Sequence, residues 1–444
     1  MAHGSANTAG RPKGDVKNLK PLMPYLRPYR LHIIAASIAL IFTSSSVLGM
    51  GKGLQYLVDQ GLGKHDTALL NEAFWMLMGV TVLLAVATYT RFYLVSYVGE
   101  RFVADIRKDV YQHLLTMHIS YFEVTSTGEL LSRLSTDAQV LQTVIGSSLS
   151  VAARNILLFV GGFALLLFTS ARLTGYVFLM VPVVIIPIIM IGRRVRHLGR
   201  EAQKRIAEAN AHAEETLNAM RTIQSLALEP YENERYSQRI TAAMNASLGR
   251  ISTRATLTAL VIFLVFGAIN IVLWIGGQDV LSGSISSGQL SAFVFYSVVV
   301  SGAVGAISEV WTDVQAAAGA AERLSELLAL KAEIISPQTA SEKTITQQAS
   351  IRFDHVYFNY PMRPEKPAIA DFTLDVESGK TVAMVGPSGA GKTTIFQLLL
   401  RFYDPKSGAV LLNGVDVRDY ALPQLRSLIG IVPQDPVIFF RHRA

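Results

Sequence analysis

Six apolar runs without charged residues divide the first three hundred residues of the chain. Each approaches the length of about 20 residues that a helix needs to cross the hydrocarbon core of a bilayer. The runs are residues 31–50, 73–90, 155–170, 173–192, 255–278 and 280–308. We therefore predict six membrane crossings, which place both ends of the chain on the same side.

The two long links between crossings have the composition of helices rather than loops. Residues 96–137 and 192–254 are rich in Ala, Leu, Glu, Arg and Gln and contain few prolines, and most of these residue types are good helix formers. We expect crossings two to five to continue as helices beyond the membrane, with turns near residues 125–128 and 214–221.

The basic residues are distributed unevenly among the links. The first thirty residues carry six Lys or Arg and one acid, and the fourth link carries eleven basic and seven acidic residues. The first and third links have few basic residues and the fifth has none. By the positive-inside rule we predict a multi-pass membrane protein with both termini in the cytoplasm.

Composition supports the membrane assignment and excludes several other classes. Half of the residues are hydrophobic and 16% are charged, which is too apolar for a purely soluble protein of 444 residues. The basic arm and the fourth link account for the net charge of +7, so we expect no nucleic-acid partner. The chain has no cysteine, which excludes disulfides, thiolate zinc sites and cysteine nucleophiles.

Arg91 is the charged residue that follows the second apolar run. It lies near the cytoplasmic end of its helix, where a long side chain can snorkel to water. We favour this interpretation, although an arginine inside a membrane helix is also a candidate functional residue.

The last hundred residues have a different pattern. After a helical stretch over residues 309–333 and a polar linker, Phe372, Leu374 and Val376 alternate with polar residues, as in a strand. Residues 381–385 are predicted to form a short buried strand. It leads into a glycine-rich loop, and residues 395–400 then favour helix. The loop reads Gly386, Pro387, Ser388, Gly389, Ala390, Gly391, Lys392, Thr393 and Thr394.

This loop fits the phosphate-binding pattern G-x-x-x-x-G-K-[ST]. Glycines let backbone N–H groups converge on phosphate oxygens, and the start of the following helix adds its positive dipole end. Lys392 would reach the β- and γ-phosphates, and the Thr393 hydroxyl would ligate Mg²⁺. The predicted cofactors are therefore ATP and Mg²⁺.

Two further residues are weaker candidates on their own. Tyr360 precedes a proline and could stack on an adenine ring. Gln434 follows the apolar stretch 429–432, which we predict to be a strand, and could sense a γ-phosphate or the metal.

Together these features resemble a half-transporter of the ABC exporter superfamily, in the group of bacterial lipid flippases and multidrug exporters. Residues 121–135 and 219–226 are similar to the two intracellular loops of that family, and residues 402–408 and 412–414 follow the phosphate loop as they do there. Tyr360 matches the adenine-stacking position and Gln434 the Q-loop glutamine, which contacts Mg²⁺ and the attacking water. The resemblance runs from about residue 27 to about residue 439 and is most specific around the phosphate loop.

The resemblance implies a fold class, a domain order and a function. The fold is an α-helical membrane protein, a six-helix exporter domain followed by an incomplete α/β P-loop nucleotide-binding domain. The function is ATP-dependent export or flipping of a lipid or amphiphilic substrate by alternating access, as half of a homodimer or heterodimer in the lipid membrane. The expected segments are a basic arm (1–26), the membrane domain (27–333), a linker (334–348) and an ATP-binding domain (349–444).

One departure from the family affects catalysis. The signature motif, the catalytic Glu and the switch His that follow the Q-loop in the family do not occur within residues 1–444, and residues 441–444 leave the family pattern. We therefore expect an interrupted or frame-shifted reading frame, or a fragment. No catalytic set is complete in this chain, and Gln434 is its sole candidate, so enzymatic activity stays open. The alternative function is a non-transporting remnant or regulatory membrane subunit that binds ATP without hydrolysing it.

Overall fold

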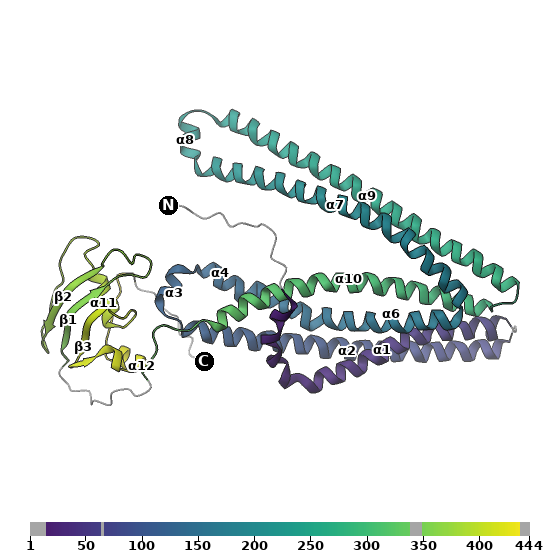
Figure 1. Cartoon of the computed structure of the whole chain (residues 1–444), viewed down its shortest axis with the longest axis horizontal. Helices are drawn as coiled ribbons and strands as arrows, with labels where there is room; N and C mark the ends of the chain where they lie inside the picture. Colours follow the sequence, from purple (N-terminus) through teal and green to yellow (C-terminus); the bar gives the residue numbers. More distant parts are fainter. Residues whose placement is uncertain (1–14, 64–65, 338–348, 436–444) are drawn as a thin grey trace. The chain divides into compact units, whose positions relative to one another are not determined.

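The computed structural model describes residues 15–63, 66–337 and 349–435. Within these ranges six helical stretches are long and apolar enough to cross a membrane, as predicted. They are Val16–Leu62, Thr67–Leu115, Thr127–Thr169, Ala171–Asn218, Glu229–Leu281 and Ser287–Ala329. The main helices in them are α1 (Arg30–Tyr56), α2 (Thr67–Leu115), α6 (Leu149–Thr169), α7 (Ala171–Asn218), α9 (Glu229–Leu281) and α10 (Ser287–Ala329) (Figure 1).

Shorter elements connect the long helices. The 3₁₀ segment η1 (Val16–Tyr29) precedes α1, and α8 (Met220–Ser225) joins α7 to α9. Between α2 and α6 lie α3 (Ile119–Val124), α4 (Thr127–Ser132) and α5 (Ala138–Thr143). The breaks after residues 124 and 218 agree with the predicted turns. The link between α9 and α10 covers residues 282–286. The sixth helix therefore begins a few residues after the start of the sixth apolar run.

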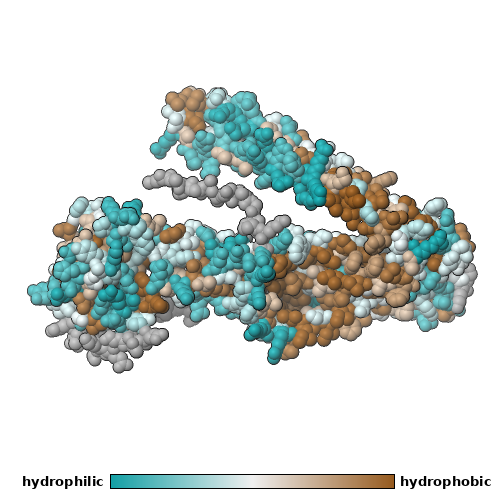
Figure 2. All heavy atoms as spheres, in the orientation of Figure 1, coloured by the Kyte–Doolittle hydropathy of each residue, from teal (hydrophilic) through white to brown (hydrophobic). Residues whose placement is uncertain are grey.

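The chain divides into two compact units, and the membrane unit comprises residues 31–95 and 148–311. Large apolar side chains cover its outer surface: Phe168 is 87% exposed and Leu179 is 70% exposed. Figure 2 shows a broad brown region over the long helices of this unit, whereas teal predominates along the α7–α9 pair toward its α8 end. A surface of this kind is stable against lipid tails and unfavourable in water.

A cluster of contacts, here called the α1–α10 clasp, joins α1 and the π-helical segment η2 (Leu57–Leu62) that follows it to the start of α10. The Asp59 carboxylate accepts hydrogen bonds from the Ser286 hydroxyl at 2.7 Å and from the Gly288 backbone N–H at 2.8 Å. Tyr296 donates its phenolic hydrogen to the Leu48 carbonyl at 3.1 Å. Asp59 therefore places a negative charge at the N-terminus of α10, where the helix dipole favours it.

Arg91 is buried, with 6% of its surface exposed. Its guanidinium Nη1 donates a hydrogen bond to the Ser150 hydroxyl of α6 at 2.7 Å. The expectation that this side chain reaches water is therefore wrong, because an acceptor on a neighbouring helix holds it inside the membrane unit.

The second unit comprises residues 1–30, 96–147 and 312–444. Its helical part has a core in which Phe102, Ile106 and Leu324 are almost fully buried. Arg323 forms two hydrogen bonds with Asp137, at 2.9 and 2.5 Å. These contacts pack the end of α10 against the segment between α4 and α5.

The C-terminal part of this unit contains a four-stranded antiparallel sheet in the order β2-β1-β3-β4. The strands are β1 (Ile351–Phe358), β2 (Ile369–Val376), β3 (Ser407–Leu412) and β4 (Val415–Asp416), and the helices are α11 (Lys392–Leu399) and α12 (Leu422–Ser427). Leu398 and Leu425 from these helices and Val410 from β3 are fully buried in one core. The alternating residues Phe372, Leu374 and Val376 lie on β2, as predicted.

Two predicted strands do not form. Residues 381–385 and 429–432 have no strand geometry, and Val385 and Val432 are 91% and 95% exposed. Pairing is what stabilises a strand, and among the described residues no strand lies beside either segment. Their apolar sequence is typical of parallel strands, which are buried on both faces of a sheet.

Candidate functional site

The glycine-rich loop ends where α11 begins, and its backbone requires glycine. Gly389 and Gly391 have φ angles of +82° and +84°, in the left-handed region that side chains disfavour. A Cβ atom at Gly391 would lie 2.6 Å from Ile369 Cδ1 and 2.7 Å from the Ala368 carbonyl oxygen. Gly391 therefore lets the loop pass directly against the start of β2.

The first turn of α11 is suited to an anion. No side chain caps this helix at Gly391, so backbone N–H groups of its first turn can bind phosphate oxygens. The Lys392 ammonium donates hydrogen bonds to the carbonyl oxygens of Gly386 and Pro387, at 2.8 and 2.9 Å. The loop thus folds around its own lysine and adds a full positive charge to the helix dipole.

A cavity of about 500 Å³ lies over the loop, within the range of small-molecule sites. Most of the residues predicted to bind nucleotide line it together: Tyr360, Ser388, Gly389, Gly391, Lys392, Thr393, Thr394 and Gln434. Gly386, Pro387 and Ala390 do not line it. The first two hold Lys392, and the Ala390 N–H closes a turn onto the Pro387 carbonyl at 3.2 Å.

The sequence interpretation missed four lining residues, which belong to the segment between β1 and β2. They are Arg363, Lys366, Pro367 and Ala368. The two cations add positive charge to a cavity that already contains Lys392, which favours a polyanionic ligand. The sequence indicated only that these residues lie close to Tyr360 along the chain. That closeness does not show which side of the loop faces the cavity.

Tyr360 forms part of the cavity wall, and other aromatic rings fix its position. Its ring centroid is 5.0 Å from that of Phe358 and 5.4 Å from that of Tyr403, both in edge-to-face geometry. Burial raises the pKa of the Tyr403 phenol well above its usual range, so this ring stays neutral. Edge-to-face contacts of this kind are favourable beyond the area they bury.

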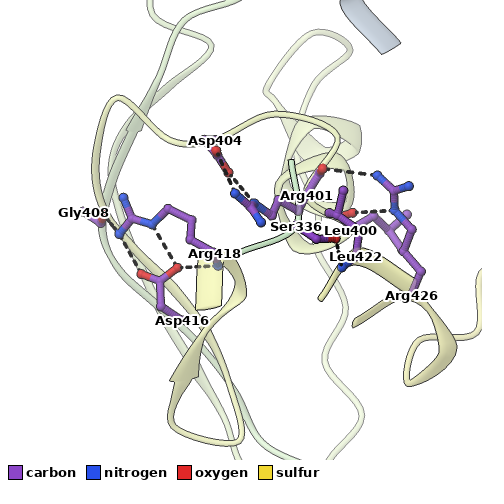
Figure 3. Close-up of polar contacts among 9 residues, drawn as sticks. All are labelled: Ser336, Leu400, Arg401, Asp404, Gly408, Asp416, Arg418, Leu422 and Arg426. Carbon is purple, nitrogen blue, oxygen red and sulfur yellow. Dashed lines mark hydrogen bonds and ion pairs between the residues drawn. The ribbon is translucent and has the colours of Figure 1, made fainter. Parts of the chain in front are cut away.

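The far end of α11 is fastened by charged side chains of its surroundings (Figure 3). Arg426 of α12 donates to the Leu400 carbonyl at 3.3 Å and to the Arg401 carbonyl at 3.4 Å. Arg401 has a φ of +51° and pairs with Asp404 at 3.0 Å. A cation at the carbonyl end of a helix stabilises it, so these contacts help to hold the helix that carries the phosphate loop.

The residues present fit a nucleoside triphosphate with a magnesium ion. Backbone donors and Lys392 suit phosphate oxygens, and the edge-to-face cluster presents Tyr360 to the same cavity. Thr393 and Gln434 add oxygen atoms, which are the ligands that Mg²⁺ prefers.

Two family profiles match the sequence of this chain. The sequence profile of the ABC transporter transmembrane region matches residues 33–304, more than half of the chain. The ABC transporter profile matches residues 369–444, which include the phosphate loop.

Similar proteins come from bacteria and eukaryotes. An export ATP-binding/permease protein of Rickettsia felis is 31% identical over 425 residues, which cover 96% of this chain and 73% of the relative. The ABC multidrug transporter mdr2 of Aspergillus fumigatus is 32% identical over 96% of this chain and 55% of its own length. ABC transporter B family member 1 of Dictyostelium discoideum is 31% identical over 96% of this chain and 47% of its own length.

The six apolar helices, the phosphate-loop cavity and these matches lead to one assignment. The chain belongs to the ABC transporter family, as an exporter-type half-transporter in which a transmembrane region is followed by a nucleotide-binding region.

Proposed function

We propose that this protein binds ATP in the cavity above α11 and uses it to export or flip a lipid or amphiphilic substrate. The observation that carries the proposal is the cavity, which gathers the phosphate loop, Tyr360 and Gln434 on the same chain as six membrane helices. The names of the relatives, which include export and multidrug transport, support the direction of movement.

Each cavity residue has a proposed role. The backbone of Gly389 and Gly391 and the Lys392 ammonium hold the phosphates, and Tyr360 stacks on the adenine ring. The Thr393 hydroxyl and the Gln434 side-chain oxygen complete the surroundings of Mg²⁺, which neutralises phosphate charge when bound.

Two chains are proposed to act together, either two copies or this chain with a related half-transporter. Alternating access then moves the substrate, with a pathway that opens to one side of the membrane at a time. Chemical cross-linking in native membranes, followed by mass measurement, distinguishes the two cases. A cross-linked product of twice the chain mass indicates a homodimer, and a heavier or lighter partner indicates a heterodimer.

The proposed location is the bacterial cytoplasmic membrane with both termini in the cytoplasm. The uneven distribution of Lys and Arg supports this orientation. Because the chain has no cysteine, a single introduced cysteine reports on sidedness without background. Ser284→Cys, in the exposed last link, should react with an impermeant maleimide on intact cells, whereas Asn210→Cys should not. Reaction at Asn210 alone would reverse the topology.

Nucleotide binding tests the central proposal. The chain is purified in nanodiscs and labelled with 8-azido-ATP in the presence of Mg²⁺. Lys392→Ala should abolish labelling, because it removes the only side-chain cation of the phosphate loop. Lys406→Ala, outside the cavity lining, is the control and should label normally. Equal labelling of both variants would contradict the proposed site.

Export is tested separately in proteoliposomes that contain a fluorescent phospholipid. ATP-dependent movement of the lipid between leaflets that is lost in Lys392→Ala would support the export proposal. Azido-ATP labelling without any movement of lipid or of a panel of amphiphilic dyes would instead favour the regulatory alternative.

A further inference from the structure

The hydroxyl of Tyr360 is held by two residues of α11. It donates a hydrogen bond to Gln397 Oε1 at 2.6 Å, and it lies 2.9 Å from the Thr394 hydroxyl. Having donated its own hydrogen to Gln397, the phenol oxygen accepts from Thr394. Both partners are more than thirty residues away in sequence and come from the helix that begins at the phosphate loop.

The two contacts restrain the ring at one end, and the aromatic cluster restrains it along its length. Phe358 and Tyr403 meet the ring at 75° and 83°, so rotation out of this position would break both edge-to-face contacts. Thr394 is 4% exposed, which places its hydroxyl away from competing water. The orientation of Tyr360 is therefore defined by α11 together with the rings of Phe358 and Tyr403.

Gln397 lies three residues after Thr394, which puts the two side chains on one face of the helix. The same helix begins with Lys392 and Thr393, which line the cavity. One rigid element thus carries the phosphate-binding groups at its start and the acceptor for Tyr360 one turn later.

We propose that Gln397 is a positioning residue for nucleotide binding: by accepting the Tyr360 hydrogen bond, it fixes the adenine-stacking ring relative to the phosphate loop. This inference rests on the proposed function, in which Tyr360 stacks on adenine. A ring that is already held in place loses little freedom when the base binds, and such pre-organisation strengthens affinity. Gln397 therefore acts on the base-dependent part of ATP affinity and leaves phosphate binding unchanged.

The test compares ATP with inorganic tripolyphosphate, which has the phosphates but no base. Dissociation constants for both are measured on the full chain in nanodiscs by competition against a fluorescent ATP analogue. Gln397→Leu removes the acceptor and should weaken ATP binding about fivefold, the equivalent of one ordinary net hydrogen bond, with no change for tripolyphosphate. Gln397→Glu keeps an acceptor oxygen and should retain the wild-type ratio of the two constants.

A second variant removes the same hydrogen bond from the other side. Tyr360→Phe loses the bond to Gln397 and also the contact with the Thr394 hydroxyl, so it should weaken ATP binding at least as much as Gln397→Leu. The double variant should be no weaker than Tyr360→Phe, because the bond to Gln397 is already absent there. If Gln397→Leu does not fold, an unchanged ATP affinity in Tyr360→Phe still overturns the inference. Gln424→Leu on α12, outside the cavity, is the matched control and should bind both ligands normally.

The outcomes separate this inference from the proposed function beneath it. A parallel loss of ATP and tripolyphosphate affinity in Gln397→Leu would show a purely structural role and overturn the inference. Unchanged ATP affinity in Gln397→Leu and Tyr360→Phe would also overturn it. Tyr360→Ala identifies failure of the stacking role itself: if removing the ring leaves the ratio of the two constants unchanged, adenine does not stack on Tyr360.

Discussion

The two sides of the nucleotide cavity differ in how they are held. On one side Tyr360, α11 and the antiparallel sheet form a continuous core, with Leu398 and Val410 fully buried. On the other side the segments 381–385 and 429–432 have no strand partner among the described residues, and Val385 and Val432 are almost fully exposed.

The difference shows which parts of a binding site can be built locally. The packed side is formed by antiparallel strands and a helix that begin and end within sixty-five residues of one another, so its contacts are complete within this part of the chain. The exposed side consists of apolar segments whose sequence fits parallel strands, and such strands need a paired strand and cover on both faces of the sheet. The groups that we propose to hold phosphate and base thus depend mainly on the packed side, and the position of Gln434 depends on the exposed one.

The largest loss of stability is expected from a substitution that leaves an empty space in the packed core. Leu398→Ala should lower the free energy of unfolding of the nucleotide-binding region by about 3 kcal/mol, because a fully buried leucine loses both burial and contacts. Urea-dependent hydrogen exchange of β1 and α11 peptides in the full chain measures it. A loss below about 1 kcal/mol would mean that this side is not the stable one.

A smaller loss is expected at the loop that joins the two sides. Gly391→Ala places a side chain at a positive φ and brings its Cβ against the Ala368 carbonyl. It should lower the free energy of unfolding by about 2 kcal/mol and remove most of the ATP affinity. Gly389→Ala is the matched control: it has nearly the same φ but open space around its Cβ, and it should cost about 1 kcal/mol. The same exchange experiment ranks them, and equal losses would remove the argument from close approach.

The fastening of α11 by Arg426 contributes less, because that side chain is partly exposed to solvent. Arg426→Ala should destabilise the nucleotide-binding region by about 1 kcal/mol through loss of two charged hydrogen bonds to helix-end carbonyls. Arg418→Ala, which removes an arginine paired with Asp416 on the surface of the sheet, should cost about half as much. Faster hydrogen exchange confined to α11 in the Arg426 variant would confirm the mechanism.

The smallest effect belongs to the exposed side. Val385→Ser should change the free energy of unfolding by less than about 0.5 kcal/mol, since the side chain is already in solvent. Val410→Ser, the same change on the buried face of β3, should cost several times more. If the two substitutions destabilised the full chain equally, Val385 would be packed against other side chains in solution. The comparison between the two sides would then fail.

The parts of the fold that the sequence predicted are those governed by local rules. Charge-free runs had to become membrane helices, since lipid offers no partner to a charge or to an open backbone. The phosphate loop was predictable because its glycines, lysine and threonine must occur at fixed spacing. Both predictions depend on residues close together in the chain.

The features that the sequence did not predict depend on partners far away in the chain. Burial of Arg91 needs Ser150, and the hydrogen bond of Tyr360 needs Gln397. The segment 381–385 has the composition of a strand, but composition cannot provide a neighbour. The sequence did predict a helix over residues 395–400, in which Gln397 lies one turn after Thr394. Nothing in the sequence showed that this face of the helix contacts Tyr360.

The α1–α10 clasp has a consequence for the equilibrium between conformations. Any state in which α1 separates from α10 at this end gives up three hydrogen bonds: two at Asp59 and one at Tyr296. At about 1 kcal/mol each, their loss shifts the population more than a hundredfold toward the joined arrangement. A ligand that opens this end must therefore bind the separated state at least that much more tightly than the joined one.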